Sequence, residues 1–159
     1  MASPLSAEAE QRLSDLGIEL PTPPRPFGAY VESVQSGRLL FLSGMLPVVD
    51  HKPKYLGRLG QELDTESGCD ALRTASMNAL SAARAHLGTL DKVTRIVRLG
   101  VYLATSGDFF DQPKVADAAS ELFESIFGKE KTSVRMVLGV ASLPLGMPVE
   151  LEVIMEVAE

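Results

Sequence analysis

Residues 133–144 run Ser-Val-Arg-Met-Val-Leu-Gly-Val-Ala-Ser-Leu-Pro. Every second residue of this stretch is apolar: Val134, Met136, Leu138 and Val140. This period of two predicts a β-strand, with Arg135, Val137 and Gly139 on its other face. A guanidinium held against an apolar sheet is costly unless it meets an anion, so Arg135 is a candidate binding residue.

Two interpretations of Arg135 stay open on local sequence. Its planar fork of N–H donors suits a carboxylate or a phosphate. Alternatively, it lies on an edge strand, where it extends to water or pairs with a surface acid.

Composition narrows the class of protein. The chain has 159 residues, which favours one domain with a substantial core. A net charge of −6 makes nucleic acid an unlikely partner, because such binding relies on clustered Lys and Arg, but it leaves room for a small anion pocket. The lone cysteine, Cys69, excludes an internal disulfide and fits a cytoplasmic protein. No apolar run approaches the ~20 residues of a membrane span, and we expect no membrane partner.

Hydrophobic periodicity predicts a mixed α+β domain. The expected elements are a helix at 6–16 capped by Ser6, strands at 29–34 and 38–43, a long helix at 65–87 capped by Asp64 or Thr65, a strand at 93–104, a helix starting near Pro113, and strands at 132–141 and 149–157. The core order is β-β-α-β-α-β-β, with two long helices on one face of the sheet. We expect residues 1–26 to form an N-terminal helix and Pro-rich connector, and residues 27–159 a single core domain.

Two helices cover one side of a sheet, yet several strands are apolar on both faces. Self-association is the simplest way to bury the second face, and we expect a cyclic homo-oligomer.

Other candidate chemistry is weak. Cys69 lies on the apolar stripe of its helix and is expected to be a buried, inert thiol. His51 and His86 lack zinc-ligand spacing, so no metal site is predicted. The chain has no phosphate-binding glycine loop and no dinucleotide motif. By themselves, Asp117 and Glu150 are explained as exposed carboxylates.

Several short motifs give the chain a family resemblance. Arg135 to Pro144 fits Arg-x-x-x-x-Val-x-x-Leu-Pro and is followed by Glu150 in an apolar last strand. Upstream lie Gly28-Ala29-Tyr30, Leu42-Ser43-Gly44 and, at 87–93, Leu-Gly-Thr-Leu-Asp-Lys-Val. In this order the motifs resemble the Rid family of reactive intermediate deaminases, also called YjgF and formerly labelled endoribonuclease L-PSP. The likeness covers residues 27–158.

The resemblance implies a chorismate-mutase-like homotrimer with clefts between subunits. Deaminating members hydrolyse 2-imino and 2-enamino acids to 2-keto acids and ammonia without a cofactor. By position, Arg135 would hold the carboxylate of the substrate and Glu150 would lie near the attacking water. Ser43 and Gly44 would line the pocket, and Tyr30 would come from the adjoining subunit.

Three pocket positions depart from the family pattern. Met45 stands where a Gln is frequent, Asp117 where many members have Asn, and Val137 where many have Cys. These changes resemble a longer subgroup, and they favour a second hypothesis: a non-catalytic protein that binds a small carboxylate metabolite. Ribonuclease activity is a third hypothesis, disfavoured by the acidic net charge and the lack of a His pair.

The pairing of the last two strands decides whether Arg135 and Glu150 can meet. A hairpin between these strands would place the two residues at its opposite ends.

Overall fold

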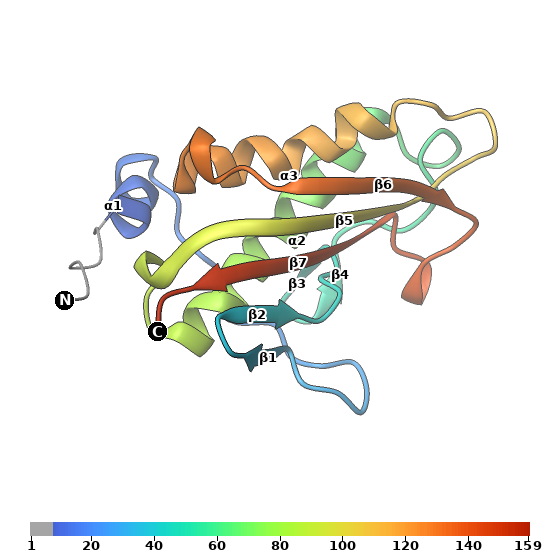
Figure 1. The fold of residues 1–159 in the computed structure, drawn as a ribbon. Coiled ribbons are helices and arrows are strands. Elements are labelled where there is room, and N and C mark those ends of the chain that lie inside the picture. The colour runs from blue at the N-terminus through green and yellow to red at the C-terminus, as the bar shows by residue number, and fades with distance from the viewer. Residues whose placement is uncertain (1–7) are drawn as a thin grey trace.

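The computed structural model describes residues 8–159 (Figure 1). The helices are α1 (Glu8–Asp15), α2 (Thr65–Leu87) and α3 (Gln112–Phe127), and the strands are β1 (Ser33–Ser36), β2 (Leu39–Leu42), β3 (Val48–Val49), β4 (Lys52–Pro53), β5 (Val93–Ala104), β6 (Val134–Val140) and β7 (Val149–Val157). The predicted core order and the mixed α+β class are confirmed. Ser6, the expected cap of the first helix, lies outside the described residues.

The main sheet has the strand order β1-β2-β7-β5-β6. Only β5 and β6 run parallel, and the other neighbours are antiparallel. The last two strands therefore do not form a hairpin. They flank β5 on either side, because α3 carries the chain from β5 to the edge position and the 141–148 segment then returns it to the sheet centre.

Both long helices lie behind the sheet in the view of Figure 1 and cover one of its faces. The Asp64 side chain accepts a hydrogen bond of 2.8 Å from the Ser67 amide and caps α2, as predicted. Gly88 ends α2 at φ 84°, a left-handed conformation that favours glycine. Between helices and sheet lies a continuous core that includes Leu72, Leu80 and Leu99.

Strand β5 departs from strict alternation. Simple periodicity places Val97, Leu99 and Val101 on one face, but Val97 is only half-buried, and Ile96 is buried instead. The pairing of β5 with β7 shifts register between Ile96 and Arg98. A β-bulge inserts one extra residue into a strand, so the side chains before it point to the opposite face of the sheet from the one that simple alternation predicts.

The first hairpin is shorter than its sequence suggests. The predicted strand at 29–34 begins only at Ser33, and residues 29–32 lie outside the sheet. Ser36 pairs with Leu39, so the turn residues are Gly37 and Arg38 rather than Ser36 and Gly37. Gly37 has φ 60°, which explains why a glycine stands there.

The N-terminal helix is fixed to the ends of the core helices. Glu10 of α1 accepts hydrogen bonds from Arg84 Nε and Nη2 at 3.1 and 2.9 Å, and a third from the Leu90 amide at 2.9 Å. The connector then crosses α2, where Ser81 Oγ donates to the Pro21 carbonyl. Among the described residues, no helix has the length and apolar character needed to cross a bilayer.

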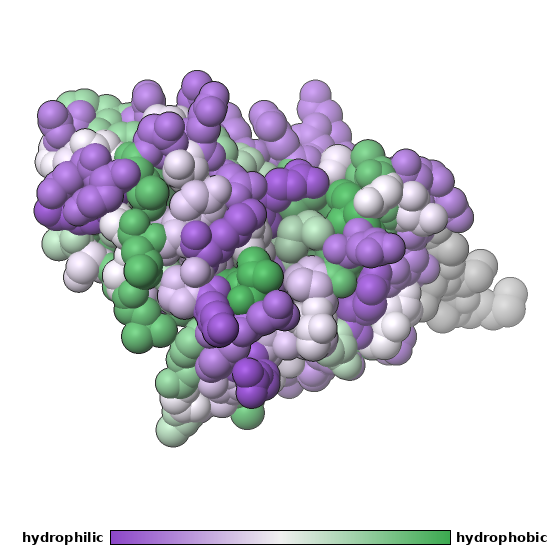
Figure 2. Space-filling view, turned by 180° about the vertical axis from the view of Figure 1, so that it is seen from behind, coloured by the Kyte–Doolittle hydropathy of each residue, from purple (hydrophilic) through white to green (hydrophobic). Residues whose placement is uncertain are grey.

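The sheet face opposite the helices is rich in exposed apolar side chains. Six of them alternate along three strands: Val34, Leu39, Phe41, Val134, Met136 and Leu138. The helix side differs, because hydrophilic side chains spread over much of it and hydrophobic ones form separate patches (Figure 2). A single copy thus leaves these apolar side chains open to solvent.

Candidate functional site

Glu150 is a partly buried carboxylate on the open face of the sheet. It lies in β7 between Val149 and Leu151, which both point into the core, so its side chain points away from the helices. Burial raises the pKa of the Glu150 carboxyl above its usual range, because the charged form loses solvation. A carboxylate in this state is better suited to take up a proton near neutral pH.

Glu150 lies in a cavity of about 430 Å³ at the end of the open face. Its lining residues are Phe27, Tyr30, Ser43, Gly44, Leu46, Pro144, Leu145 and Glu150. Four candidates from sequence, Tyr30, Ser43, Gly44 and Glu150, thus share one cavity. Tyr30 belongs to the same chain as the other three here, although the resemblance implied that it would come from a neighbour.

Gly44 allows the close approach of the Glu150 side chain. A Cβ atom at position 44 would lie only 2.9 Å from Glu150 Cδ, and closer still to Oε1. Beside it, Ser43 Oγ donates to the Val31 carbonyl at 2.5 Å, and the Ser43 amide donates to the Glu32 carbonyl at 2.9 Å. The backbone at 43–44 is therefore fixed against residues 31–32, and a larger residue at position 44 would displace the carboxylate.

Arg135 lies on the other face of the sheet. It pairs with Leu99, whose side chain is in the core beneath the helices. Its Nη1 atom donates to Asp117 Oδ1 at 2.7 Å and to Ser120 Oγ at 3.1 Å, both on α3. Arg135 and Asp117 form an ion pair in which the Arg side chain is 30% exposed and the Asp side chain 50%.

One copy of the chain therefore cannot bring Arg135 and Glu150 to the same ligand. Their strands lie on either side of β5, where Arg135 pairs with Leu99 and Glu150 pairs with Tyr102. The two side chains project from opposite faces of the sheet. However, β6 is an edge strand, so Arg135 lies at the border of the molecule. Both residues can contact one ligand only when a second copy supplies one of them.

The remaining sequence candidates lie outside the cavity. Met45 is 1% exposed and belongs to the hydrophobic core, and its backbone pairs with Leu151. Val137 packs on the core from the helix side of β6. The Cys69 side chain is half-buried rather than fully buried, and burial raises the pKa of its thiol, which disfavours the reactive thiolate. Residues 8–159 contain no cluster of three or more His, Cys, Asp or Glu side chains placed to hold a metal ion.

The cavity also contains residues that the periodicity argument missed. Phe27 and Leu46 come from irregular segments, where no periodicity indicates which way a side chain points. Leu145 has φ 58°, a strained value for a branched residue, and it follows Pro144 in a short 3-10 turn. Leu143 and Pro144 end the Arg-x-x-x-x-Val-x-x-Leu-Pro motif, but the place of Pro144 beside Glu150 depends on how the 141–148 segment crosses the sheet edge.

The sequence profile described as "YjgF/chorismate mutase-like, putative endoribonuclease" matches residues 10–157. The chain belongs to the YjgF family. Among its relatives is Protein TCP17 of Trypanosoma cruzi, 39% identical over 152 residues that make up 95% of each chain. A second is the 2-iminobutanoate/2-iminopropanoate deaminase of Dermatophagoides farinae, 27% identical over 137 residues, or 85% of this chain and 91% of the relative.

The YjgF fold extends to solved structures. The crystal structure of Atu1372 from Agrobacterium tumefaciens, a protein of unknown function, has a TM-score of 0.87 and 33% identity, covering 97% of this chain and 95% of that one. Both TCP17 and Atu1372 match nearly the full length, so the segment before the core is common to these relatives and this chain.

Proposed function

We propose that the protein hydrolyses 2-imino and 2-enamino acids to 2-keto acids and ammonia. The observation that carries the proposal is Glu150, a carboxylate with a raised pKa in a cavity lined by Tyr30, Ser43 and Gly44. Membership of a family with a distant relative named as an imino-acid deaminase supports the same chemistry.

The proposed reaction requires little from the protein. A 2-enamino acid first tautomerises to the 2-imino acid, gaining a proton at its β-carbon and losing one from nitrogen. The protonated imine carbon is electrophilic, and water adds to it to give a carbinolamine. Glu150 orients this water and accepts its proton, and proton transfer to nitrogen then lets ammonia leave as the keto acid forms. No covalent intermediate with the chain is needed.

Arg135 is proposed to bind the substrate carboxylate from a second copy. Its guanidinium offers paired donors at the sheet edge, which suits bidentate binding. A neighbouring subunit would also cover the apolar open face. A cyclic homotrimer is the assembly proposed here, and it would form the site by bringing the edge strand of one copy to the cavity of the next.

The second candidate is a protein that binds a small carboxylate without turnover. The departures of Met45, Asp117 and Val137 from the family pattern motivate it, because they change the surroundings of the site without removing Arg135. The ion pair with Asp117 weakens the binding of a carboxylate at Arg135 in either candidate and does not distinguish the two.

Keto-acid release from freshly generated 2-aminoacrylate separates these proposals. The wild type is expected to accelerate release, and Arg135→Ala to lose this acceleration. Arg73→Ala, which removes one exposed positive charge from α2, is the matched control and keeps the wild-type rate. An assembled wild type that binds a 2-keto acid calorimetrically but accelerates nothing supports the binding protein instead.

A further inference from the structure

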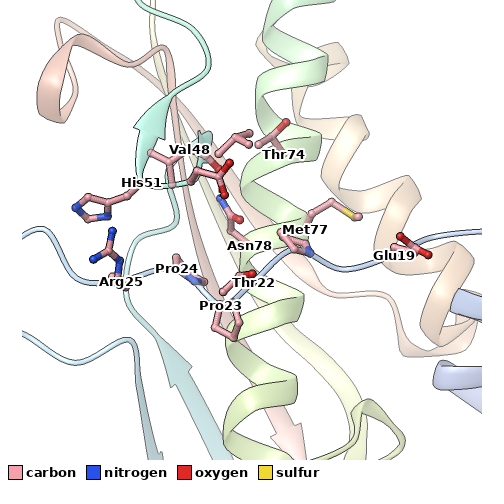
Figure 3. Close-up of a pocket in the computed structure, with 13 residues that line it drawn as sticks. Glu19, Thr22, Pro23, Pro24, Arg25, Val48, His51, Thr74, Met77 and Asn78 are labelled. Carbon is pink, nitrogen blue, oxygen red and sulfur yellow. The ribbon is translucent and has the colours of Figure 1, made fainter.

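A second cavity lies outside the candidate site. It encloses about 480 Å³ between the Pro-rich connector, the turn joining β3 to β4, and α2 (Figure 3). Its walls include Pro23 and Arg25 from the connector, His51 from the turn, and Met77 and Asn78 from α2. None of its lining residues lines the Glu150 cavity.

Two nitrogen groups at one end of this cavity lack partners. The Nδ1 atom of His51 is buried and has no hydrogen bond within residues 8–159. Arg25 makes no ion pair and no side-chain hydrogen bond with any described residue, and Figure 3 shows its side chain beside His51. A buried polar atom without a partner costs free energy, so the His51 nitrogen is of a kind that a bound group commonly satisfies, whereas Arg25 is exposed to solvent and available to an anion.

His51 is held in place by a strained turn. Asp50 and His51 have φ values of 52° and 65°, both in the left-handed region. A two-residue turn of this kind favours Asn-Gly, and a side chain at its second position costs of order 1 kcal/mol. The His51 ring is stacked on Phe27, with centroids 4.0 Å apart and planes 7° from parallel. Strain retained at an unpaired group points to a role other than stability.

The lining restricts the class of ligand. Arg25 is the one permanent cation of the lining, while Glu19 and Asp50 also border the cavity, and their charges oppose a dianion such as phosphate more strongly than a carboxylate with a single charge. Met77, Val48 and the connector prolines supply an apolar surface. The Asn78 amide donates to the Leu46 and Val48 carbonyls at 3.0 Å, which fixes the wall opposite the connector.

We propose that this cavity is a second binding site, for a small carboxylate with an apolar body. Arg25 binds the carboxylate, His51 donates to it as the Nδ1–H tautomer, and the aliphatic part lies on Met77 and the prolines. Residues 19–25 form one wall, so the segment before the core has a binding role here. The Phe27 ring separates the two sites, because it stacks on His51 and lines the Glu150 cavity.

Methyl NMR of methionine-labelled protein tests the site, with hexanoate as the probe. The Met77 methyl resonance is expected to shift saturably with hexanoate and not with hexanamide, which has the same body without the charge. Met155, which is buried in the core and lines neither cavity, serves as the internal reference and should not move.

The variants decide which groups hold the probe. Arg25→Gln is expected to weaken the Met77 response at least 10-fold, and His51→Asn to weaken it less. Lys52→Gln removes the same charge from an exposed neighbour outside the lining and should leave the response intact. No saturable Met77 shift, an undiminished shift in Arg25→Gln, or equal loss in Lys52→Gln would each overturn the proposal. Because Glu150→Gln leaves this cavity untouched, the result is independent of the deaminase assay.

Discussion

Replacing Asp117 by Asn is expected to strengthen the binding of carboxylates at Arg135. In the wild type, Asp117 Oδ1 lies 2.7 Å from Arg135 Nη1 and competes with any anionic ligand for the guanidinium. Asn keeps an oxygen that can accept this hydrogen bond but removes the negative charge. Both the competition and the repulsion of an incoming carboxylate fall.

The exposure of the pair sets the size of the effect. With side chains 30% and 50% exposed, the interaction is screened by solvent, and ion pairs of this kind contribute about 0.2–1 kcal/mol. At about 1.4 kcal/mol per tenfold change, the dissociation constant for a carboxylate should fall by about 1.4-fold to 5-fold. The free energy of unfolding should fall by no more than about 1 kcal/mol.

Isothermal titration calorimetry with 2-oxobutanoate and with its methyl ester measures this effect. Only the acid should bind more tightly to Asp117→Asn. Glu121→Gln removes an exposed charge from the same helix and is the matched control. If Asp117→Asn binds 2-oxobutanoate no more tightly than the wild type, or if the affinities for the acid and the ester rise equally, the result refutes the view that Arg135 binds the carboxylate and that Asp117 opposes it.

Three further variants test the site and the N-terminal helix. In Gly44→Ala, the new methyl group must displace the Glu150 carboxylate, so keto-acid release should be lost while circular dichroism stays that of the wild type. Because the pKa of Glu150 is raised in the folded state, the folded chain binds more protons than the unfolded chain. The free energy of unfolding therefore falls as pH rises through the pKa of Glu150 in the folded state. Glu150→Gln should flatten this fall, which urea unfolding from pH 4 upward measures. Glu10→Ala loses its contacts with Arg84 and the Leu90 amide and should cost about 1–2 kcal/mol by urea unfolding, against about 0.5 kcal/mol or less for Glu8→Ala. Equal costs in the last pair would show that the Glu10 contacts do not hold α1 in place.

Sequence periodicity predicted the long elements because their own side chains determine them. The bounds of α2 and β5 agree with those expected, since α2 carries an apolar stripe between Asp64 and Gly88 and β5 is apolar over most of its length. The bulge near Ile96 and the late start of β1 were missed, because both depend on the partner strand rather than on local pattern.

The candidate site was only partly predictable for a related reason. Tyr30, Ser43, Gly44 and Glu150 were named from motifs, and the structure places them around one cavity. That Arg135 points to the opposite face follows from strand order, which no local pattern encodes. The core position of Met45 depends on its bridge to Leu151, a contact over more than a hundred residues.

Complementation between two inactive variants tests the central claim most directly. Arg135→Ala and Glu150→Gln, each purified alone, are expected to release no keto acid from 2-aminoacrylate beyond the uncatalysed rate. If each site takes Arg135 from one copy and Glu150 from another, joint refolding of equal amounts of the two variants should restore activity in about one quarter of all sites. Activity near that level is the predicted result, and mixed oligomers as inactive as their parents would contradict a deaminase site shared between copies.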